Sequence, residues 1–186
     1  MTTPPPGQDA LPLDVPEPAA APMADFRAPL PGPVRYDLVP SPLGDLLLTG
    51  DGESLTGLHM DAPPPPDAVH DPGSLRATAE ELRAYFAGEL REFSARLAPS
   101  GSAFQLQVWR RLTSVPYGRT ASYGDIARAL DAPGASRAVG TANNRNPISI
   151  VIPCHRIVGA DGSLVGYGGG LPRKQILLRL ERTGRL

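Results

Sequence analysis

The second half of the chain carries two helix-start signals of the same kind, and these limit what it can fold into. Ser102 stands three residues before Gln105, and Ser122 stands three residues before Asp125. In such a capping box, the two side chains satisfy backbone N–H groups that the start of a helix leaves free. Apolar residues follow each signal at helical spacing, which predicts one helix through about residue 113 and another over about 122–130.

Helix-breaking residues divide the rest of this half into further short elements. Pro133-Gly134 ends the second helix, and a third helix, capped by Ser136, is expected over roughly 136–144. A last helix is expected over about 171–182. Two short helices joined by a tight turn predict a helix-turn-helix, although an ordinary helical hairpin is the commoner arrangement.

The two halves of the chain carry opposite charge. Residues 101–186 hold 11 arginines and 1 lysine against 4 acidic residues, a net charge of +8. Residues 1–100 hold 6 arginines against 15 acidic residues, a net charge of −9, so the formal charge of the chain is only −1. A basic second half favours a polyanionic partner such as DNA, although charge also drifts along many chains without functional meaning.

Short apolar segments separated by turn residues characterise the first half, and they predict an antiparallel meander. The expected strands are 34–39, 45–50 and 54–60, with a further strand over 92–97. Residues 74–88 predict a helix, because their apolar side chains repeat on one face. Residues 1–33 are rich in proline and alanine and bury too little to repay their ordering entropy.

The predicted organisation has three parts. Residues 1–33 form a disordered tail, and residues 34–99 form an α/β domain with a small antiparallel sheet and a helix. Residues 100–186 form a mainly helical domain, helix-turn-helix or winged-helix-like, that would suit a DNA partner and that contains Cys154, the only cysteine. The sequence has no apolar run long enough to span a membrane and no signal peptide pattern, so we expect a cytoplasmic protein.

Cys154 is the strongest candidate nucleophile. It follows the apolar run Ile148–Ile152, which we interpret as a buried strand, and it precedes His155. A thiolate needs a base or a positive environment to form near neutral pH, and His155 is adjacent. A lone cysteine is also commonly a small buried hydrophobe, and His155 could be a core histidine. One cysteine excludes an internal disulfide and multi-cysteine zinc sites.

Two further features leave alternatives open. Glu181, near the end of the last helix, could orient a histidine or could be a solvated charge. The run Gly166–Gly170, which contains Tyr167, permits close approach of a flat ligand, but it is also typical of a mobile surface loop. The residues alone therefore indicate a nucleophilic cysteine beside a DNA-facing helix pair, without identifying the substrate.

The heptad Ile152-Pro153-Cys154-His155-Arg156-Ile157-Val158 is the most specific motif of the chain, and an ordered set of further motifs accompanies it. These are Ser41-Pro42-Leu43-Gly44, Leu55-Thr56-Gly57-Leu58, Phe104-Gln105, Val108-Trp109, Pro116-Tyr117-Gly118, Ser122-Tyr123, Arg137-Ala138-Val139-Gly140, Asn146-Pro147, Gly166-Tyr167, Leu177-Leu178 and Leu180-Glu181. Over about residues 35–183 the sequence thus resembles the methylated-DNA–protein-cysteine methyltransferases, also called O6-alkylguanine-DNA alkyltransferases.

The resemblance implies direct reversal of DNA alkylation. Cys154 would accept the alkyl group of O6-alkylguanine in an in-line displacement, with His155 acting as base through a water and Glu181 fixing the imidazole. Tyr123 would help to protonate the departing guanine, and Asn146 would brace the turn around the site. The thioether product is not reversed by thiols, so each molecule would act once, with no metal or organic cofactor.

The implied partner is double-stranded DNA that carries O6-alkylguanine, bound through the minor groove with little sequence preference. Base flipping is required, because a buried thiol cannot reach O6 inside a stacked duplex, and Arg137 would enter the stack in place of the base. The other implied DNA contacts are Tyr123, Ser122, Ala138 and Arg145. The implied base pocket consists of Tyr167, Gly168, Gly169, Ile157 and Trp109, and the carbonyls of Cys154 and Ile157 accept from the guanine amine. A monomer without membrane contact is expected.

Gly168 departs from relatives that carry a hydroxyl residue at this position, which predicts room for larger alkyl groups. Three other functions fit the sequence less well. Cys154 argues against a lesion-binding protein of the same fold, in which the cysteine is replaced. A cysteine hydrolase acting on another substrate fits the basic helix pair poorly, and a plain helix-turn-helix protein leaves the cysteine, histidine and glutamate unexplained.

Overall fold

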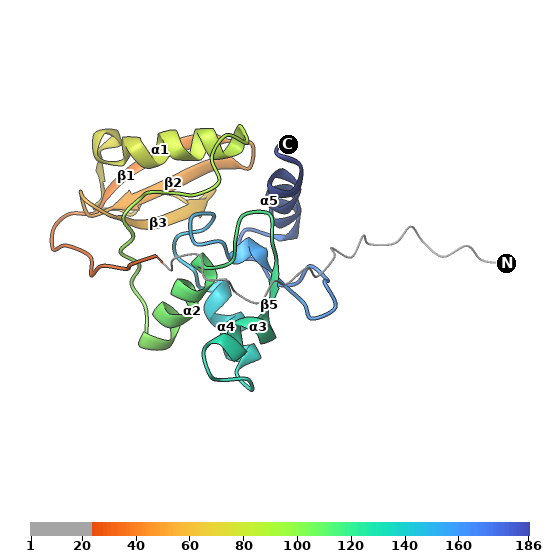
Figure 1. Cartoon of the computed structure of the whole chain (residues 1–186). Coiled ribbons are helices and arrows are strands. Elements are labelled where there is room, and N and C mark those ends of the chain that lie inside the picture. Colours follow the sequence, from red (N-terminus) through yellow and green to blue (C-terminus); the bar gives the residue numbers. More distant parts are fainter. Residues whose placement is uncertain (1–23) are drawn as a thin grey trace.

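The computed structural model describes residues 24–186, which form two regions (Figure 1). The first contains strands β1 (Arg35–Ser41), β2 (Gly44–Gly50), β3 (Leu55–Met60) and β4 (Val69–His70) and helix α1 (Pro72–Phe86). The second contains helices α2 (Ala103–Thr113), α3 (Tyr123–Ala129), α4 (Ser136–Asn144) and α5 (Leu171–Thr183), strands β5 (Ala121–Ser122) and β6 (Ile157–Val158), and the 3-10 turn η1 (Cys154–Arg156). The predicted fold class, an α/β region followed by a mainly helical one, is confirmed.

The N-terminal sheet is mixed, with strand order β3-β2-β1-β4. Strands β1, β2 and β3 pair antiparallel as predicted, whereas β4 runs parallel to β1. The expectation of a purely antiparallel sheet is therefore wrong at this edge. Residues 61–68 carry the chain from β3 at one edge of the sheet to β4 at the opposite edge, where β4 runs in the same direction as β1. Leu46, Leu47 and Leu48 of β2 are all buried, so both faces of this strand are covered.

Helix α1 lies along one face of this sheet (Figure 1). It begins two residues before the predicted start, because the Asp71 carboxylate accepts from the Ser74 N–H and Pro72 suits the first turn of a helix. The strand predicted over 92–97 does not form. Within this segment only Leu97 makes β-bridges, one to Leu55 and one to Phe26.

The helices of the second region begin largely where the capping signals predicted. Both capping boxes are present, with Ser102 at the start of α2 and Ser122 at the start of α3. Helix α4 is an exception, because Ser136 is its first residue and the preceding Ala135 occupies the cap without a side-chain hydrogen bond. Helices α3 and α4 pack against each other and against α2, as a helix-turn-helix requires.

The apolar run before Cys154 is a turn and not the predicted strand. Ile148 forms a single bridge to Leu58 of β3, after which the chain turns. The Leu58 N–H donates to the Pro147 carbonyl at 2.8 Å, and the Ser149 N–H donates to the Leu58 carbonyl at 3.2 Å. Ile150 has a φ of 70°, which a β-branched residue rarely adopts. The run is apolar because it is buried between the two regions.

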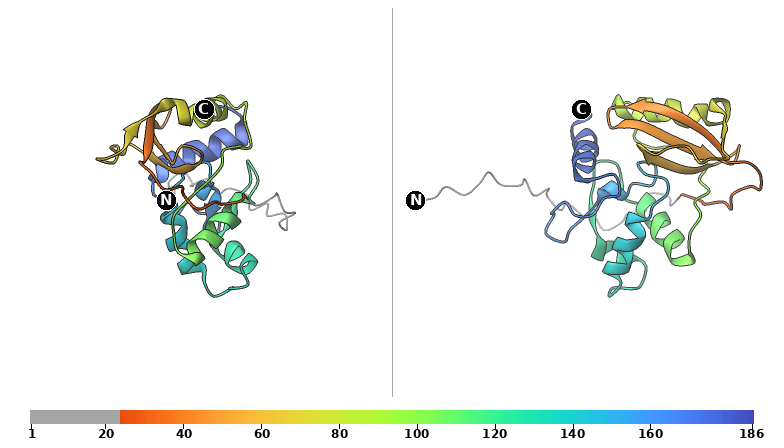
Figure 2. Two further views of the ribbon diagram at one scale, coloured as in Figure 1. Left: turned by 90° about the vertical axis from the view of Figure 1, so that its left-hand side faces the viewer. Right: turned by 180° about the vertical axis from the view of Figure 1, so that it is seen from behind.

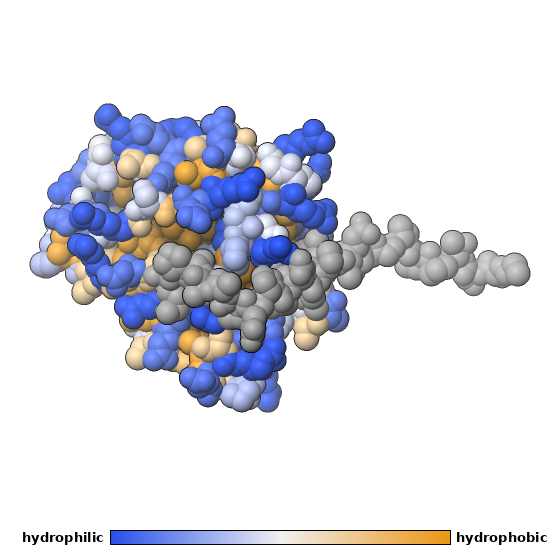
Figure 3. All heavy atoms as spheres, viewed as in Figure 1, coloured by the Kyte–Doolittle hydropathy of each residue, from blue (hydrophilic) through white to orange (hydrophobic). Residues whose placement is uncertain are grey.

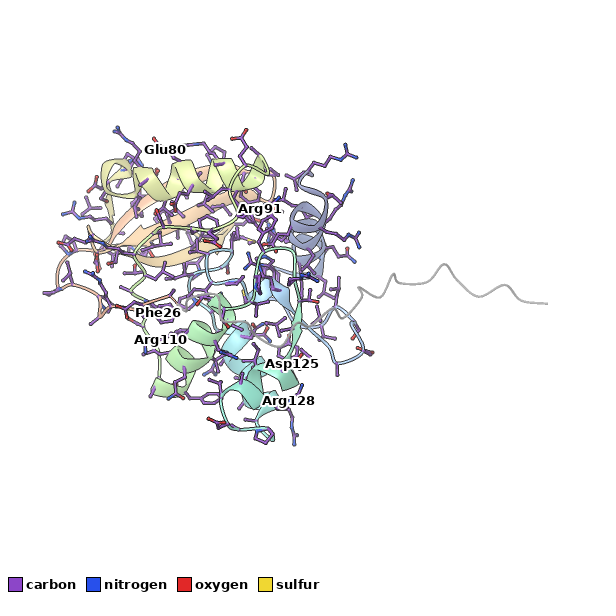
Figure 4. The ribbon with its side chains drawn as sticks, in the orientation of Figure 1. Phe26, Glu80, Arg91, Arg110, Asp125 and Arg128 are labelled. Atoms are coloured by element: carbon purple, nitrogen blue, oxygen red, sulfur yellow. The ribbon has the colours of Figure 1, made fainter. Side chains whose placement is uncertain are left out.

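Residues 24–33 form an ordered arm, which corrects the expectation of a disordered tail over 1–33; residues 1–23 lie outside the described residues. Phe26 is 8% exposed, and the guanidinium of Arg110 on α2 lies over its ring at 5.5 Å. Figure 4 shows these two side chains meeting between the sheet and α2. The Ala24 N–H donates to the Thr113 hydroxyl at 2.9 Å. A single buried aromatic thus anchors a segment whose composition predicts disorder.

The two regions meet beside α5. Figure 2 shows α5 next to the N-terminal sheet, while α2, α3 and α4 lie at the other end of the molecule. Hydrophilic residues cover most of the face drawn in Figure 3, and the apolar residues show mainly as areas between them. None of the helices within residues 24–186 is long and apolar enough to cross a membrane.

Candidate active site

Cys154 lies at the start of the η1 turn and is only 3% exposed. Its N–H donates to the Ile152 carbonyl at 2.8 Å, and its own carbonyl accepts from the Ile157 N–H. Asn146 holds the chain ahead of the cysteine, because its Nδ2 donates to the Ile152 carbonyl at 2.8 Å and its Oδ1 accepts from the Ile148 N–H at 3.0 Å. This geometry supports a bracing role for Asn146.

His155 and Glu181 form a buried pair next to the cysteine. The His155 Nε2 lies 2.8 Å from the Glu181 Oε1, and both side chains are fully buried. Burial lowers the pKa of His155 although the Glu181 carboxylate opposes this shift, so the ring is neutral at neutral pH. With its proton on Nε2, the ring has its lone pair on Nδ1, which is buried and has no hydrogen-bond partner among the described residues. His155 can therefore act as a base through Nδ1.

The Glu181 carboxylate collects hydrogen bonds from several parts of the chain. Tyr85 donates its hydroxyl at 2.8 Å, the Gly118 N–H donates at 3.0 Å, and Arg156 donates through Nε and Nη2 at 3.0 Å each. Burial by itself would raise the pKa of Glu181, but His155 and Arg156 together hold it well below its ordinary value. Glu181 is thus ionised and buried, and its carboxylate accepts hydrogen bonds from several donors. The alternative of a solvated charge is wrong.

Two members of this network were not predicted from the sequence. Arg156 appeared only as part of a motif, yet its Nη1 also donates to the Val115 carbonyl at 2.6 Å. Tyr85 lies on α1 in the N-terminal region, 96 residues from Glu181 in the chain. The apolar face of α1 indicates that Tyr85 is buried, but only the packing of the two regions brings its hydroxyl to the carboxylate.

Two tyrosines lie near the cysteine. The Tyr123 hydroxyl donates at 3.1 Å to the carbonyl of Val165, which directly precedes the glycine-rich loop Gly166–Gly170. Tyr167 is 9% exposed, and its hydroxyl is buried without a hydrogen-bond partner among residues 24–186. Burial raises the pKa of both hydroxyls, and negative charge on Cys154 would raise both further. Both phenols therefore remain protonated and can donate hydrogen bonds.

The glycines of the loop differ in what they require. A Cβ at Gly169 would lie 2.8 Å from the Tyr167 ring and 2.9 Å from the Met60 sulfur, so the loop packs closely against β3 there. A Cβ at Gly168 would find its nearest neighbour, the Asn144 carbonyl, at 3.5 Å. This is ordinary contact, so Gly168 leaves space where a larger residue would fit.

Two residues of the expected base pocket have other partners. The Ile157 carbonyl accepts from the Lys174 ammonium at 2.5 Å, so one of its lone pairs is already used. Trp109 is 1% exposed and donates its indole N–H to the Ala142 carbonyl at 2.8 Å. Trp109 therefore joins α2 to α4 in the core.

The expected DNA contacts lie on α3 and α4. Arg137 and Ala138 are exposed in the first turn of α4, and Arg145 is exposed just beyond its last residue. Ser122 is 7% exposed, and its hydroxyl accepts from the Asp125 N–H and donates to the Asp125 carboxylate. Its side chain is used in capping α3, so we do not assign it to a DNA phosphate.

Comparison with known families identifies the family of the chain. Residues 103–183 match the family model described as "6-O-methylguanine DNA methyltransferase, DNA binding domain", and residues 34–99 match its "ribonuclease-like domain". The chain belongs to the methylated-DNA–protein-cysteine methyltransferase family. The ordered arm of residues 24–33 precedes both matched ranges.

Individual relatives extend this result over most of the chain. The methylated-DNA–protein-cysteine methyltransferase of Mycobacterium tuberculosis is 49% identical over 154 residues, which cover 81% of this chain and 93% of the relative. That of Methanosarcina acetivorans is 47% identical and covers 78% of this chain and 97% of its own. The crystal structure of Mycobacterium tuberculosis OGT in complex with DNA superposes with a TM-score of 0.78, at 49% identity, covering 81% of this chain and 94% of that chain.

Proposed function

We propose that this methyltransferase repairs duplex DNA by transferring the alkyl group of O6-alkylguanine to Cys154. The observation that carries the proposal is a buried cysteine beside a neutral histidine. The Nε2 of this histidine is held by the ionised Glu181. The Sγ–carbon bond forms as the carbon–O6 bond breaks, and guanine leaves with the electron pair. The thioether is stable to thiols, so each molecule acts once.

Proton transfer is assigned to the groups around the cysteine. His155 Nδ1 accepts the thiol proton, directly or through a water, and the Glu181 carboxylate stabilises the imidazolium that forms. The departing guanine needs one proton, and the Tyr123 hydroxyl is the donor that faces the site. Tyr123 must release the Val165 carbonyl in order to donate to the base.

Duplex binding is assigned to α3 and α4. Cys154 is 3% exposed, so the target base must leave the stack to reach it. Arg137 is exposed in the first turn of α4, and we assign it to the position that the base vacates. Ala138 and Arg145 are also exposed, and we assign them to the DNA backbone. The Mycobacterium tuberculosis relative was solved in complex with DNA, which supports DNA as the partner. Such binding would keep the protein associated with the nucleoid.

The base pocket is assigned to Tyr167 with the neighbouring glycines. The Tyr167 ring is buried beside the cysteine, and its free hydroxyl can donate to the base. A Cβ at Gly168 would meet only the Asn144 carbonyl, at 3.5 Å, so this position of the loop leaves space. We therefore expect the protein to accept groups larger than methyl.

The test is to mix the purified protein with a duplex containing one O6-methylguanine and to measure the intact protein mass. The expected result is a single added methyl, saturating at one per molecule and absent from Cys154→Ser. A duplex containing O4-methylthymine, run in parallel, tests the substrate range. Tight binding of the lesion duplex by both proteins without added mass would instead favour a lesion-binding function.

A further inference from the structure

Lys174, in the first turn of α5, is an unusual buried cation. It is fully buried, and its ammonium donates to the carbonyls of Ile157 at 2.5 Å and Val165 at 2.8 Å. No carboxylate of residues 24–186 forms an ion pair with it. Burying an ammonium against neutral carbonyls alone is costly, so this position calls for an explanation.

The choice of residue is also unusual in this chain. Lys174 is the only lysine of the chain, and all the other Lys or Arg positions are occupied by arginine. An ammonium is a compact point charge that fits between two carbonyls, whereas a guanidinium is planar and needs more donors satisfied. The site therefore needs a small cation, and a buried cation needs a compensating anion.

The neighbouring charges leave one candidate. The Glu181 carboxylate is already paired with Arg156, so it is not available to compensate Lys174. His155 is neutral and supplies no charge of either sign. The Ile157 N–H donates to the Cys154 carbonyl while the Ile157 carbonyl accepts from Lys174, so one residue connects the cation to the cysteine turn. The Cys154 thiolate is the anion that this arrangement can compensate.

Other groups face the Cys154 sulfur from the elements around it. Tyr123 approaches from α3 and Tyr167 from the loop, and both are neutral. Burial raises the pKa of the Cys154 thiol, while hydrogen bonding from Asn146 and the charge of Lys174 act in the opposite direction. Burial lowers the pKa of Lys174 to about 8, and negative charge on Cys154 opposes that shift. Each charge thus favours the other.

We propose that Lys174 is a positioning residue whose buried ammonium is the counter-charge for the Cys154 thiolate as it forms. His155 removes the thiol proton, and Lys174 reduces the electrostatic cost of the anion left behind. Transfer turns the thiolate into a neutral thioether, so Lys174 loses its counter-charge when repair is complete. This role rests on the proposed function only in that Cys154 reacts as a thiolate, and its test needs no DNA.

The first test measures the ionisation of Cys154 as the difference in ultraviolet absorbance between each protein and its Cys154→Ser counterpart. The subtraction removes the overlapping absorbance of the tyrosines and leaves one thiolate, because the chain has one cysteine. Lys174→Met should raise the Cys154 pKa by about one unit, leaving about tenfold less thiolate at a given pH. Arg179→Met removes the same charge from the exposed side of α5 and should leave the pKa unchanged. An unchanged Cys154 pKa in folded Lys174→Met would overturn the proposal.

The second test keeps Lys174 in place, so it holds even if Lys174→Met does not fold. Isotopically labelled lysine gives one side-chain NMR signal, because Lys174 is the only lysine. Coupling between two sites is reciprocal, so Cys154→Ser should move the titration of Lys174 to lower pH. The same midpoint in both proteins would refute the pairing. Failure of methyl transfer from DNA, with the lysine shift intact, would refute only the proposed function.

Discussion

At the scale of single residues, Glu181 sets the protonation of the site. Its carboxylate accepts from His155 and Arg156, and these interactions keep it ionised despite its burial. An ionised Glu181 holds the imidazole proton on Nε2 and leaves Nδ1 as the basic nitrogen. A buried carboxylate with this much compensation also ties the stability of the protein to pH.

Glu181→Gln should destabilise the protein by about 3 kcal/mol or more at neutral pH, because Arg156 would keep its charge in the interior without a partner. The pKa of Glu181 is lowered on folding, so its stabilising contribution is complete above its ordinary value of 4.5 and is lost as the pH falls below it. Urea unfolding across this range measures both effects. Glu181→Gln should show a weaker loss of stability on acidification, and an equal loss in both proteins would contradict the assignment.

At the scale of elements, α4 presents the residues that we assign to DNA binding, and the arm of residues 24–33 holds the start of the helical region. Arg137 is exposed at the start of α4, while Val139 on the same helix is buried against the core. The arm joins Leu97 to α2, since the Arg27 N–H donates to the Leu97 carbonyl at 2.9 Å and Arg110 lies over Phe26. We therefore expect changes on the exposed side of α4 to affect DNA recognition and changes in the arm to affect stability.

Arg137→Ala should slow methyl transfer from duplex DNA by about tenfold or more, which corresponds to about 1.4 kcal/mol. Transfer from the free base O6-methylguanine needs no flipping, so its rate should not change. Single-turnover rates with the two substrates make the comparison, and Arg76→Ala on the exposed side of α1 is the control. Equal slowing with both substrates would show that Arg137 acts on the site itself.

Phe26→Ala should lower the free energy of unfolding by about 3 kcal/mol, because it removes a buried ring and the cation–π contact with Arg110. Leu30→Ala is the matched control, since Leu30 lies on the same arm and is 46% exposed. Its effect should stay within about 0.5 kcal/mol. Urea denaturation of the three proteins tests this, and similar values for both variants would mean that the arm does not stabilise the fold.

At the scale of the whole molecule, the N-terminal region completes the active site of the helical one. Tyr85 on α1 donates to Glu181, and Leu58 on β3 holds the turn that leads to the cysteine. The sheet thus contributes no nucleophile or base, but it fixes the positions of both. Separating the two regions would leave the Glu181 network incomplete.

Tyr85→Phe should cost about 1.5–3 kcal/mol of stability, the usual range for a hydrogen bond to a charged group. Methyl transfer should also slow, whereas affinity for duplex DNA should stay unchanged, because α1, which carries Tyr85, lies at the opposite end of the molecule from α3 and α4 (Figure 1). Tyr36→Phe deletes the same atom from a partly exposed residue of β1 and is the control. Normal stability and transfer in Tyr85→Phe would mean that the two regions are functionally independent.

The sequence by itself determined where most helices begin and which residue is the nucleophile. Capping boxes at Ser102 and Ser122 are local, since the residues that form them are neighbours in the chain, and both are present in the structure. The same locality explains why the strands of the meander were predicted correctly. The order of the family motifs around Cys154 led to the family that the comparisons then established.

The tertiary structure alone decided how the site is completed. An apolar run such as Ile148–Ile152 indicates burial but not the form of the backbone, and here packing against β3 makes it a turn. The partners of Glu181 and Lys174 are distant in sequence or are backbone carbonyls, which leave no pattern in side-chain type. Periodicity and capping report on near neighbours, whereas a buried charge is matched by groups that only the packed chain brings together.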